Sequence, residues 1–283
     1  MFRILLALFI FLPLSSVFAA SPSSTLRFSP LPMLSEHLVK EQFLSFCSSL
    51  SELTCQNVSL IYKKDYQDLL KALHNDELDL AYLGPLPYVM ARKTDPDIIP
   101  VVRFLDKHQK ATYTCSLVTF GHNHPNLDAD YPTIALTQPY STCGYLVTES
   151  LLSPYQHSLN DCPYTYVGDH EQAALAVIRG DAALAGVKTT IARRYENLGL
   201  TILDESAPLP GFLLVANRRT LDPATIDQLR SDLLSLNHAF SADQKEKPEW
   251  GKMIRYGMIE AHDEDYDAIR ALLTRFPVPE ILP

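Results

Sequence analysis

Alternation of strand-like and helix-like segments is the feature that most limits what this chain can fold into. Residues 58–62 have the pattern of a strand, residues 66–74 have that of a helix that Asp65 can cap, and residues 78–83 form a buried strand. The same alternation starts again at residue 133. It is typical of α/β folds in which mainly parallel sheets are covered by helices on both faces. We therefore expect an α/β protein.

Two places in the chain interrupt this alternation, at residues 113–117 and 209–212. We interpret them as crossings between two lobes, each a mainly parallel sheet flanked by helices. The expected first lobe is discontinuous, with residues 20–113 and 210–283, and the second lobe is residues 114–209. Two lobes joined by two crossings form a hinged clamp that can bury a ligand by closing.

The first residues have the composition of a secretory signal peptide. Arg3 precedes an apolar run over residues 4–14, and Val17 and Ala19 are small residues of the kind that a signal peptidase requires. We expect residues 1–19 to be removed and the protein to be periplasmic. The apolar run is too short to cross a bilayer.

The charge of the chain excludes one class of partner. Removing Arg3 leaves 23 basic residues against 33 acidic ones, a net charge of −10. This excess argues against a nucleic acid partner. It does not exclude a small anion, because a buried site is governed by donors at close range.

The cysteines and histidines match no zinc pattern, and we expect neither a metal nor a cofactor. Five cysteines cannot all pair. In an oxidising compartment the candidate bridges are Cys47 with Cys55 and Cys143 with Cys162, which leaves Cys115 over.

Two adjacent hydroxyl residues stand where a predicted strand gives way to a predicted helix, in Ser141-Thr142-Cys143-Gly144-Tyr145. Hydroxyl donors and the free amides of a helix N-terminus suit an oxyanion, and a glycine lets the backbone come close. The alternative is an ordinary helix cap, for which serine and threonine are also common. We predict a site for a small anion.

A second polar cluster, Asp169-His170-Glu171, follows about one βαβ unit later. His170 can donate to an oxyanion, and its protonated form would add a charge that depends on pH. Tyr66 and Tyr113 are candidate phenolic donors.

An enzyme is the alternative from another class, with Ser141, His170 and Asp169 as a nucleophilic set. However, Ser141 lacks the Gly-x-Ser-x-Gly elbow, and an adjacent aspartate and histidine make poor partners. We therefore expect a binding protein and no enzymatic activity.

Four motifs follow one another along the chain: Lys64-Asp65-Tyr66, Asp79-Leu80-Ala81-Tyr82-Leu83-Gly84-Pro85, the Ser141 to Tyr145 turn, and Asp169-His170-Glu171 with the alanine-rich helix after it. In this order they resemble the periplasmic phosphonate, phosphite and phosphate binding proteins of ABC importers, which have the type II periplasmic binding protein fold. The resemblance implies that Ser141, Thr142 and nearby amides, those of Cys143 and Gly144, hold the oxyanion. Tyr66, Tyr113 and His170 would complete the set.

The resemblance also shows where this chain departs from its relatives. Those that take aminoalkylphosphonates hold the ammonium with two carboxylates, and the corresponding positions here are Thr190 and Phe212. Neither can neutralise a buried cation, whose desolvation costs several kcal/mol. We therefore expect a compact or apolar substituent, as in phosphite or methylphosphonate, with phosphate as a further candidate.

The resemblance implies a monomer that delivers its ligand to an ABC permease in the inner membrane. The alternative is a stand-alone sensory module of the same fold that reports to a membrane sensor protein. The departures at Thr190 and Phe212 are compatible with such a changed pocket.

Overall fold

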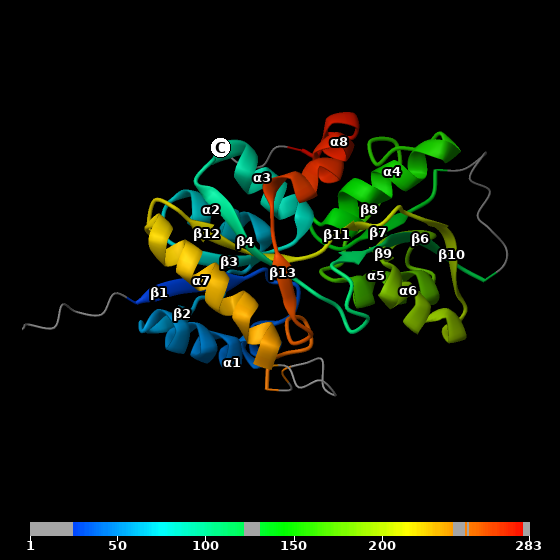
Figure 1. Cartoon of the computed structure of the whole chain (residues 1–283). Coiled ribbons are helices and arrows are strands. Elements are labelled where there is room, and N and C mark those ends of the chain that lie inside the picture. Colours follow the sequence, from blue (N-terminus) through cyan, green and yellow to red (C-terminus); the bar gives the residue numbers. More distant parts are fainter. Residues whose placement is uncertain (1–24, 122–130, 240–246, 248, 280–283) are drawn as a thin grey trace, which may run out of the picture.

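The computed structural model describes residues 25–121, 131–239, 247 and 249–279. The predicted signal peptide lies outside this part of the chain. Two sheets with their helices form two lobes side by side, and β11 lies between them (Figure 1). We call the elements around the six-stranded sheet the first lobe and those around the five-stranded sheet the second lobe. Among the described residues, no helix is long and apolar enough to span a membrane.

The sheet of the first lobe has the strand order β13-β4-β12-β3-β1-β2. Its strands are β1 (Leu26–Pro30), β2 (Val58–Leu60), β3 (Leu80–Leu83), β4 (Ile98–Phe104), β12 (Leu213–Asn217) and β13 (Met258–Glu260). Its helices are α1 (Glu36–Thr54), α2 (Tyr66–His74), α3 (Pro85–Thr94), α7 (Pro223–Ser235) and α8 (Asp267–Arg275), with the 3-10 turns η4 (Leu236–Ala239) and η5 (Asp263–Tyr266).

The sheet of the second lobe has the strand order β10-β6-β9-β7-β8. Its strands are β6 (Cys115–Phe120), β7 (Ile134–Leu136), β8 (Tyr164–Tyr166), β9 (Leu184–Lys188) and β10 (Leu200–Glu205). Its helices are the π-helix η1 (Thr142–Val147), α4 (Thr148–Leu152), α5 (His170–Arg179) and α6 (Thr189–Arg194), with the 3-10 turns η2 (Ser153–Tyr155) and η3 (Glu196–Leu198).

Two short strands carry the chain between the lobes. These strands, β5 (Thr112–Tyr113) and β11 (Leu209–Pro210), pair with each other in antiparallel fashion. The first sheet takes its strands from both sides of the segment that forms the second sheet. The α/β class and the two-lobed fold are thus as predicted.

Most strands of each sheet point in one direction, as predicted: four of six in the first lobe and four of five in the second. Each sheet is nevertheless mixed, because the remaining strands run antiparallel. Strands β1, β2 and β3 are parallel, but β12 runs antiparallel to both β3 and β4. In the second lobe β6 runs antiparallel to both β9 and β10. The reason is chain direction: β6 and β12 start at the crossings, whereas the neighbouring βα strands end on that side of the molecule.

Local signals in the sequence account for several helix ends. Asp65 caps α2 as predicted, since its side chain accepts a hydrogen bond from the amide of Asp68 at 2.8 Å. Helix α3 was not predicted, because Pro85 and Pro87 interrupt the sequence pattern. Both prolines lie in its first turn, where the missing N–H would have no helical acceptor.

One face of the first sheet packs against α1 through aromatic side chains. The ring of Phe46 lies 5.8 Å from that of Phe28, 5.8 Å from that of Phe104 and 5.0 Å from that of Trp250 (centroid distances). All four side chains are buried. Aromatic pairs at these distances add about 0.5–1.5 kcal/mol each beyond the burial of their surface.

The cysteine pairing differs from both predicted candidates, because Cys115 is bonded to Cys143. Cys115 opens β6, which pairs with β9 so that Leu117 lies opposite Gly186. The backbone of η1 packs on Gly186, where an added Cβ would lie 2.9 Å from the carbonyl oxygen of Cys143. This packing brings the two Cα atoms to 5.2 Å, a contact that sequence spacing cannot reveal.

The predicted bridges fail for separate reasons. Cys47 is buried within α1 and Cys55 is its exposed C-cap. Their residue numbers differ by eight, which along a helix is a distance of roughly 12 Å, too far for a disulfide. Cys162 is buried as a free thiol, since Cys143 is already bonded.

We expect Cys115→Ala to lower the free energy of unfolding by about 3 kcal/mol, because the bridge closes a loop with a sequence separation of 28. Urea unfolding measures this change. The double variant Cys115→Ala/Cys143→Ala should cost little more than the single one, since the same bridge is lost. Cys55→Ser, at an exposed free thiol, serves as the control and should change stability by less than about 0.5 kcal/mol. Peptide mapping that finds Cys143 joined to Cys162 would contradict the assignment.

Candidate functional site

A small cavity of about 20 Å³ lies between the lobes, where strands of both sheets end. Its lining residues come from the segments that directly follow strands, from the end of β9, or from the crossings. They are Leu31, Met33, Tyr66, Gly84, Pro87, Tyr113, Ser141, Thr142, Cys143, His170, Lys188 and Phe212. The carboxyl ends of parallel strands are where α/β proteins bind their ligands.

Four helix N-termini meet at this cavity. Tyr66 begins α2, Gly84 caps α3, Ser141 caps η1 and His170 begins α5. Each N-terminus carries unpaired amides and a partial positive charge of roughly half an elementary unit. The cavity is therefore electropositive, although the chain as a whole is acidic.

The predicted turn is both a helix cap and part of the cavity wall. The hydroxyl oxygen of Ser141 accepts a hydrogen bond from the amide of Gly144 at 3.1 Å, which is the ordinary capping role. Because this oxygen accepts, its own proton can be donated to a ligand. Ser141 and Thr142 are both buried, and both line the cavity.

Thr142 also connects the two lobes. Its hydroxyl oxygen accepts a hydrogen bond from the amide of Leu86, in the first turn of α3, at 3.0 Å. Beside it, the side-chain amide of Gln138 donates to the carbonyl of Pro32 at 3.0 Å. The lobes are thus joined by hydrogen bonds next to the cavity.

Tyr66 and Tyr113 supply neutral donors. Burial raises the pKa of both phenols above its ordinary value, so each keeps its proton at neutral pH. A neutral phenol can donate to an oxyanion without repelling it.

His170 lines the cavity as a neutral ring, which corrects the expectation of a pH-dependent charge in the neutral range. Burial, with the nearby positive charge of Lys188, lowers the pKa of His170 to about 4. Its Nδ1 accepts a hydrogen bond from the backbone amide of Lys188 at 3.3 Å. The proton of the neutral ring is therefore on Nε2, which remains a donor.

Lys188 is a lining residue that the sequence reading missed. It is the last residue of β9, and its Nζ lies 5.0 Å from the ring centroid of Tyr113 and 5.6 Å from that of Phe212. Burial lowers the pKa of this amine. Nothing in the sequence distinguishes it from a surface lysine at a strand end, because its position depends on the packing of the lobes.

The remaining predicted residues occupy different places. Phe212 lines the cavity and stacks on Tyr82, with ring centroids 5.4 Å apart. Thr190 is exposed on α6 and is not among the lining residues. Gly144 lies behind the wall, where an added Cβ would be 2.0 Å from the hydroxyl oxygen of Thr137, so the close approach it allows is to the sheet.

Comparison with known families places the whole chain. Residues 28–266 match the model of a family described as the periplasmic substrate-binding protein of phosphonate ABC transporters. The chain belongs to this family of phosphonate-binding proteins.

Solved structures of similar proteins share the fold. PhnD1 from Prochlorococcus marinus, in complex with methylphosphonate, is 16% identical with a TM-score of 0.73, over 90% of this chain and 98% of that one. A binding protein component of an ABC phosphonate transporter from Pseudomonas aeruginosa is 19% identical with a TM-score of 0.69, over 89% of this chain and 86% of that one. Both likenesses show the two-lobed type II periplasmic binding protein fold.

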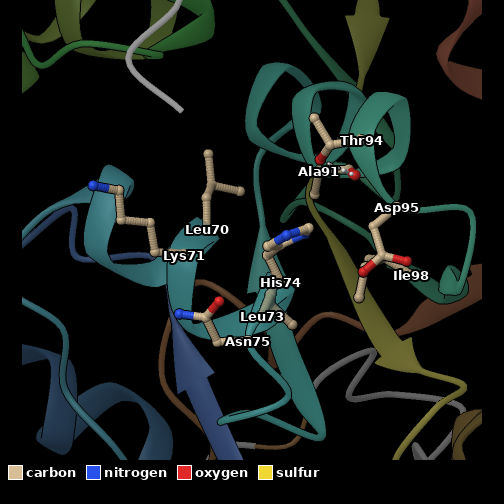
Figure 2. Close-up of a pocket in the computed structure, with 9 residues that line it drawn as sticks. All are labelled: Leu70, Lys71, Leu73, His74, Asn75, Ala91, Thr94, Asp95 and Ile98. Atoms are coloured by element: carbon tan, nitrogen blue, oxygen red, sulfur yellow. Dashed lines mark hydrogen bonds between the residues drawn. The ribbon is translucent and has the colours of Figure 1, made fainter. Parts of the chain in front are cut away.

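A larger cavity of about 140 Å³ lies in the first lobe of this phosphonate-binding protein, between α2 and α3 (Figure 2). It is lined by His74 and Asn75 at the end of α2 and by Thr94 and Asp95 at the end of α3. Its polar wall is formed by helix C-termini, which carry partial negative charge, whereas helix N-termini face the smaller cavity. The smaller cavity between the lobes is the better candidate.

We expect His170 to make the unliganded protein sensitive to acid. In the unfolded chain His170 has its ordinary pKa of 6.5, whereas in the folded protein its pKa is about 4. The unfolded chain therefore takes up a proton at a higher pH. The free energy of unfolding should therefore fall as the pH drops from about 6.5 towards 4. Urea unfolding at several pH values measures this slope, which should become shallower in His170→Gln. The control is His108→Gln, at an exposed loop position, which should leave the slope unchanged. An unchanged slope in His170→Gln would count against a neutral buried ring.

Proposed function

We propose that this phosphonate-family protein captures phosphite, methylphosphonate or phosphate between its lobes and delivers it to an ABC permease. The observation that carries the proposal is the character of the cavity wall. Of the described residues that line it, none is an aspartate or glutamate, while four helix N-termini, two phenols, two hydroxyls and Lys188 face one small space. Such a wall favours an anion and excludes a cation.

In this proposal Ser141, Thr142 and the first amides of η1, including that of Cys143, hold the oxygens of the ligand. Tyr66, Tyr113 and His170 donate from the other sides. The small size of the cavity and the ring of Phe212 favour a ligand with a hydrogen or methyl substituent over one with a long tail.

We further propose residues 20–113 with 210–283 and residues 114–209 as the two rigid lobes, with β5 and β11 as the hinge. The hydrogen bonds from Leu86 to Thr142 and from Gln138 to Pro32 join the lobes across the cleft and support a closed arrangement. A ligand that contacts both lobes stabilises this arrangement by population shift.

Covalent chemistry is not part of the proposal. Asp169 accepts a hydrogen bond from the amide of Gln172 as the cap of α5. The Nδ1 of His170 accepts from the amide of Lys188, so this nitrogen carries no proton with which a carboxylate could orient the ring. This geometry favours binding over hydrolysis. We also propose that residues 1–19 are removed on secretion and that the protein acts as a monomer.

We expect phosphite, methylphosphonate or phosphate to raise the melting temperature of the purified protein. A ligand at a hundred times its dissociation constant should add about 2.7 kcal/mol of stability. In Ser141→Ala this ligand-induced shift should largely disappear, because one donor and the cap of η1 are lost together. Differential scanning fluorimetry with these ligands, sulfate and simple carboxylates makes the measurement.

The matched control is Asp222→Ala, which removes the cap of α7, a helix with no residue in the cavity wall. It should lower the melting temperature without changing the shift caused by the ligand. No response of the wild type to any phosphorus oxyanion would refute the proposed ligand class and would favour the sensory alternative.

A further inference from the structure

Lys188 is a half-buried cation in the cavity wall without a counter-ion at ion-pair distance. Within the described part of the chain it forms no ion pair, and only the carboxylate of Asp106 attracts it from further away. Oδ1 of Asp106 already accepts from the amides of His108 and Lys110, at 2.8 and 2.9 Å. A buried charge is costly unless it is paired.

The groups around the Lys188 amine compensate its positive charge only in part. Its Nζ faces the rings of Tyr113 and Phe212, whose π electrons attract a cation but carry no net negative charge. The other titratable groups nearby are the neutral ring of His170 and the protonated phenol of Tyr113, and neither offers a negative charge.

Lys188 lines the cavity from the end of β9, two positions before Thr190. The residue expected there from the sequence, Thr190, is exposed instead. The charge that this part of the wall presents is therefore positive, and it repels an ammonium group.

We propose that Lys188 is the specificity-determining residue of the site: it serves as the counter-ion of a doubly charged oxyanion and excludes ligands that carry an ammonium group. This inference rests on the proposed function and narrows its ligand class to dianions such as phosphite, methylphosphonate and phosphate. A singly charged analogue leaves part of the positive charge of the wall uncompensated. An aminoalkylphosphonate would bring a second cation to a cavity that already holds one.

Isothermal titration calorimetry tests the proposal with two ligands of similar shape and different charge. At slightly alkaline pH methylphosphonate carries two negative charges, whereas methanesulfonate carries one. The wild type should bind methylphosphonate far more tightly. Lys188→Met keeps an apolar stem against the aromatic rings but removes the charge. It should weaken methylphosphonate binding by at least ~30-fold and methanesulfonate binding by much less.

Reversing the charge at position 188 provides a second test. Lys188→Glu should lose methylphosphonate and bind 2-aminoethylphosphonate more tightly than the wild type does. The matched control is Lys110→Met, which removes an exposed lysine near the same crossing and should leave all affinities within about twofold. The melting temperature of unliganded Lys188→Met should equal or exceed that of the wild type, because a half-buried charge has been removed.

The outcomes separate the two proposals. If the wild type binds methylphosphonate and Lys188→Met binds it equally well, the role of Lys188 is refuted while the proposed function stands. If the wild type prefers 2-aminoethylphosphonate, the proposal that Lys188 excludes ammonium-bearing ligands is refuted, but binding of phosphonates is not. If the wild type binds no phosphorus oxyanion, both proposals are refuted.

Discussion

The site depends on one constraint of chain direction. Each helix that follows a parallel strand begins at the carboxyl end of that strand, so parallel strands place several helix N-termini along one edge of a sheet. Here two such edges face each other across the crossings β5 and β11. The N-termini of α2, α3, η1 and α5 therefore meet at one cavity. The binding chemistry follows from this arrangement, because it produces a positive potential before any side chain is added.

The side chains of the cavity wall add hydrogen-bond donors and one positive charge to this potential. Tyr66, Tyr113 and His170 are neutral donors at neutral pH, because burial keeps the phenols protonated and His170 uncharged. Lys188 is the one charged residue of the described wall. A ligand with two negative charges offsets the cost of burying that cation and at the same time pairs with the helix amides. In the proposed function, the ligand relieves an electrostatic cost that the unliganded protein bears at Lys188.

The turn from Ser141 to Tyr145 is held in place by the second lobe. The disulfide from Cys143 ties the start of η1 to β6, and Gly144 and Gly186 let the helix lie directly on the sheet. The opposite side of the cavity belongs to the first lobe, and Thr142 reaches it through the amide of Leu86. One wall is therefore held by a covalent bond within its own lobe, which suits the clamp proposed about β5 and β11.

Sequence alone was sufficient for the features that depend on local patterns: the α/β class, the cap at Asp65, the polar turn at Ser141 and Thr142, and the order of motifs that marks the family. It could not fix features that depend on contacts between distant segments. The bond from Cys115 to Cys143 requires the pairing of β6 with β9, and the neutral state of His170 requires its burial beside Lys188. Local pattern determined which elements form and where the polar turn of the cavity wall lies. Only tertiary packing decided which cysteines pair and which side chains line the cavity, including its cation Lys188. These properties arise from residues that are distant in the sequence and meet only in the folded protein.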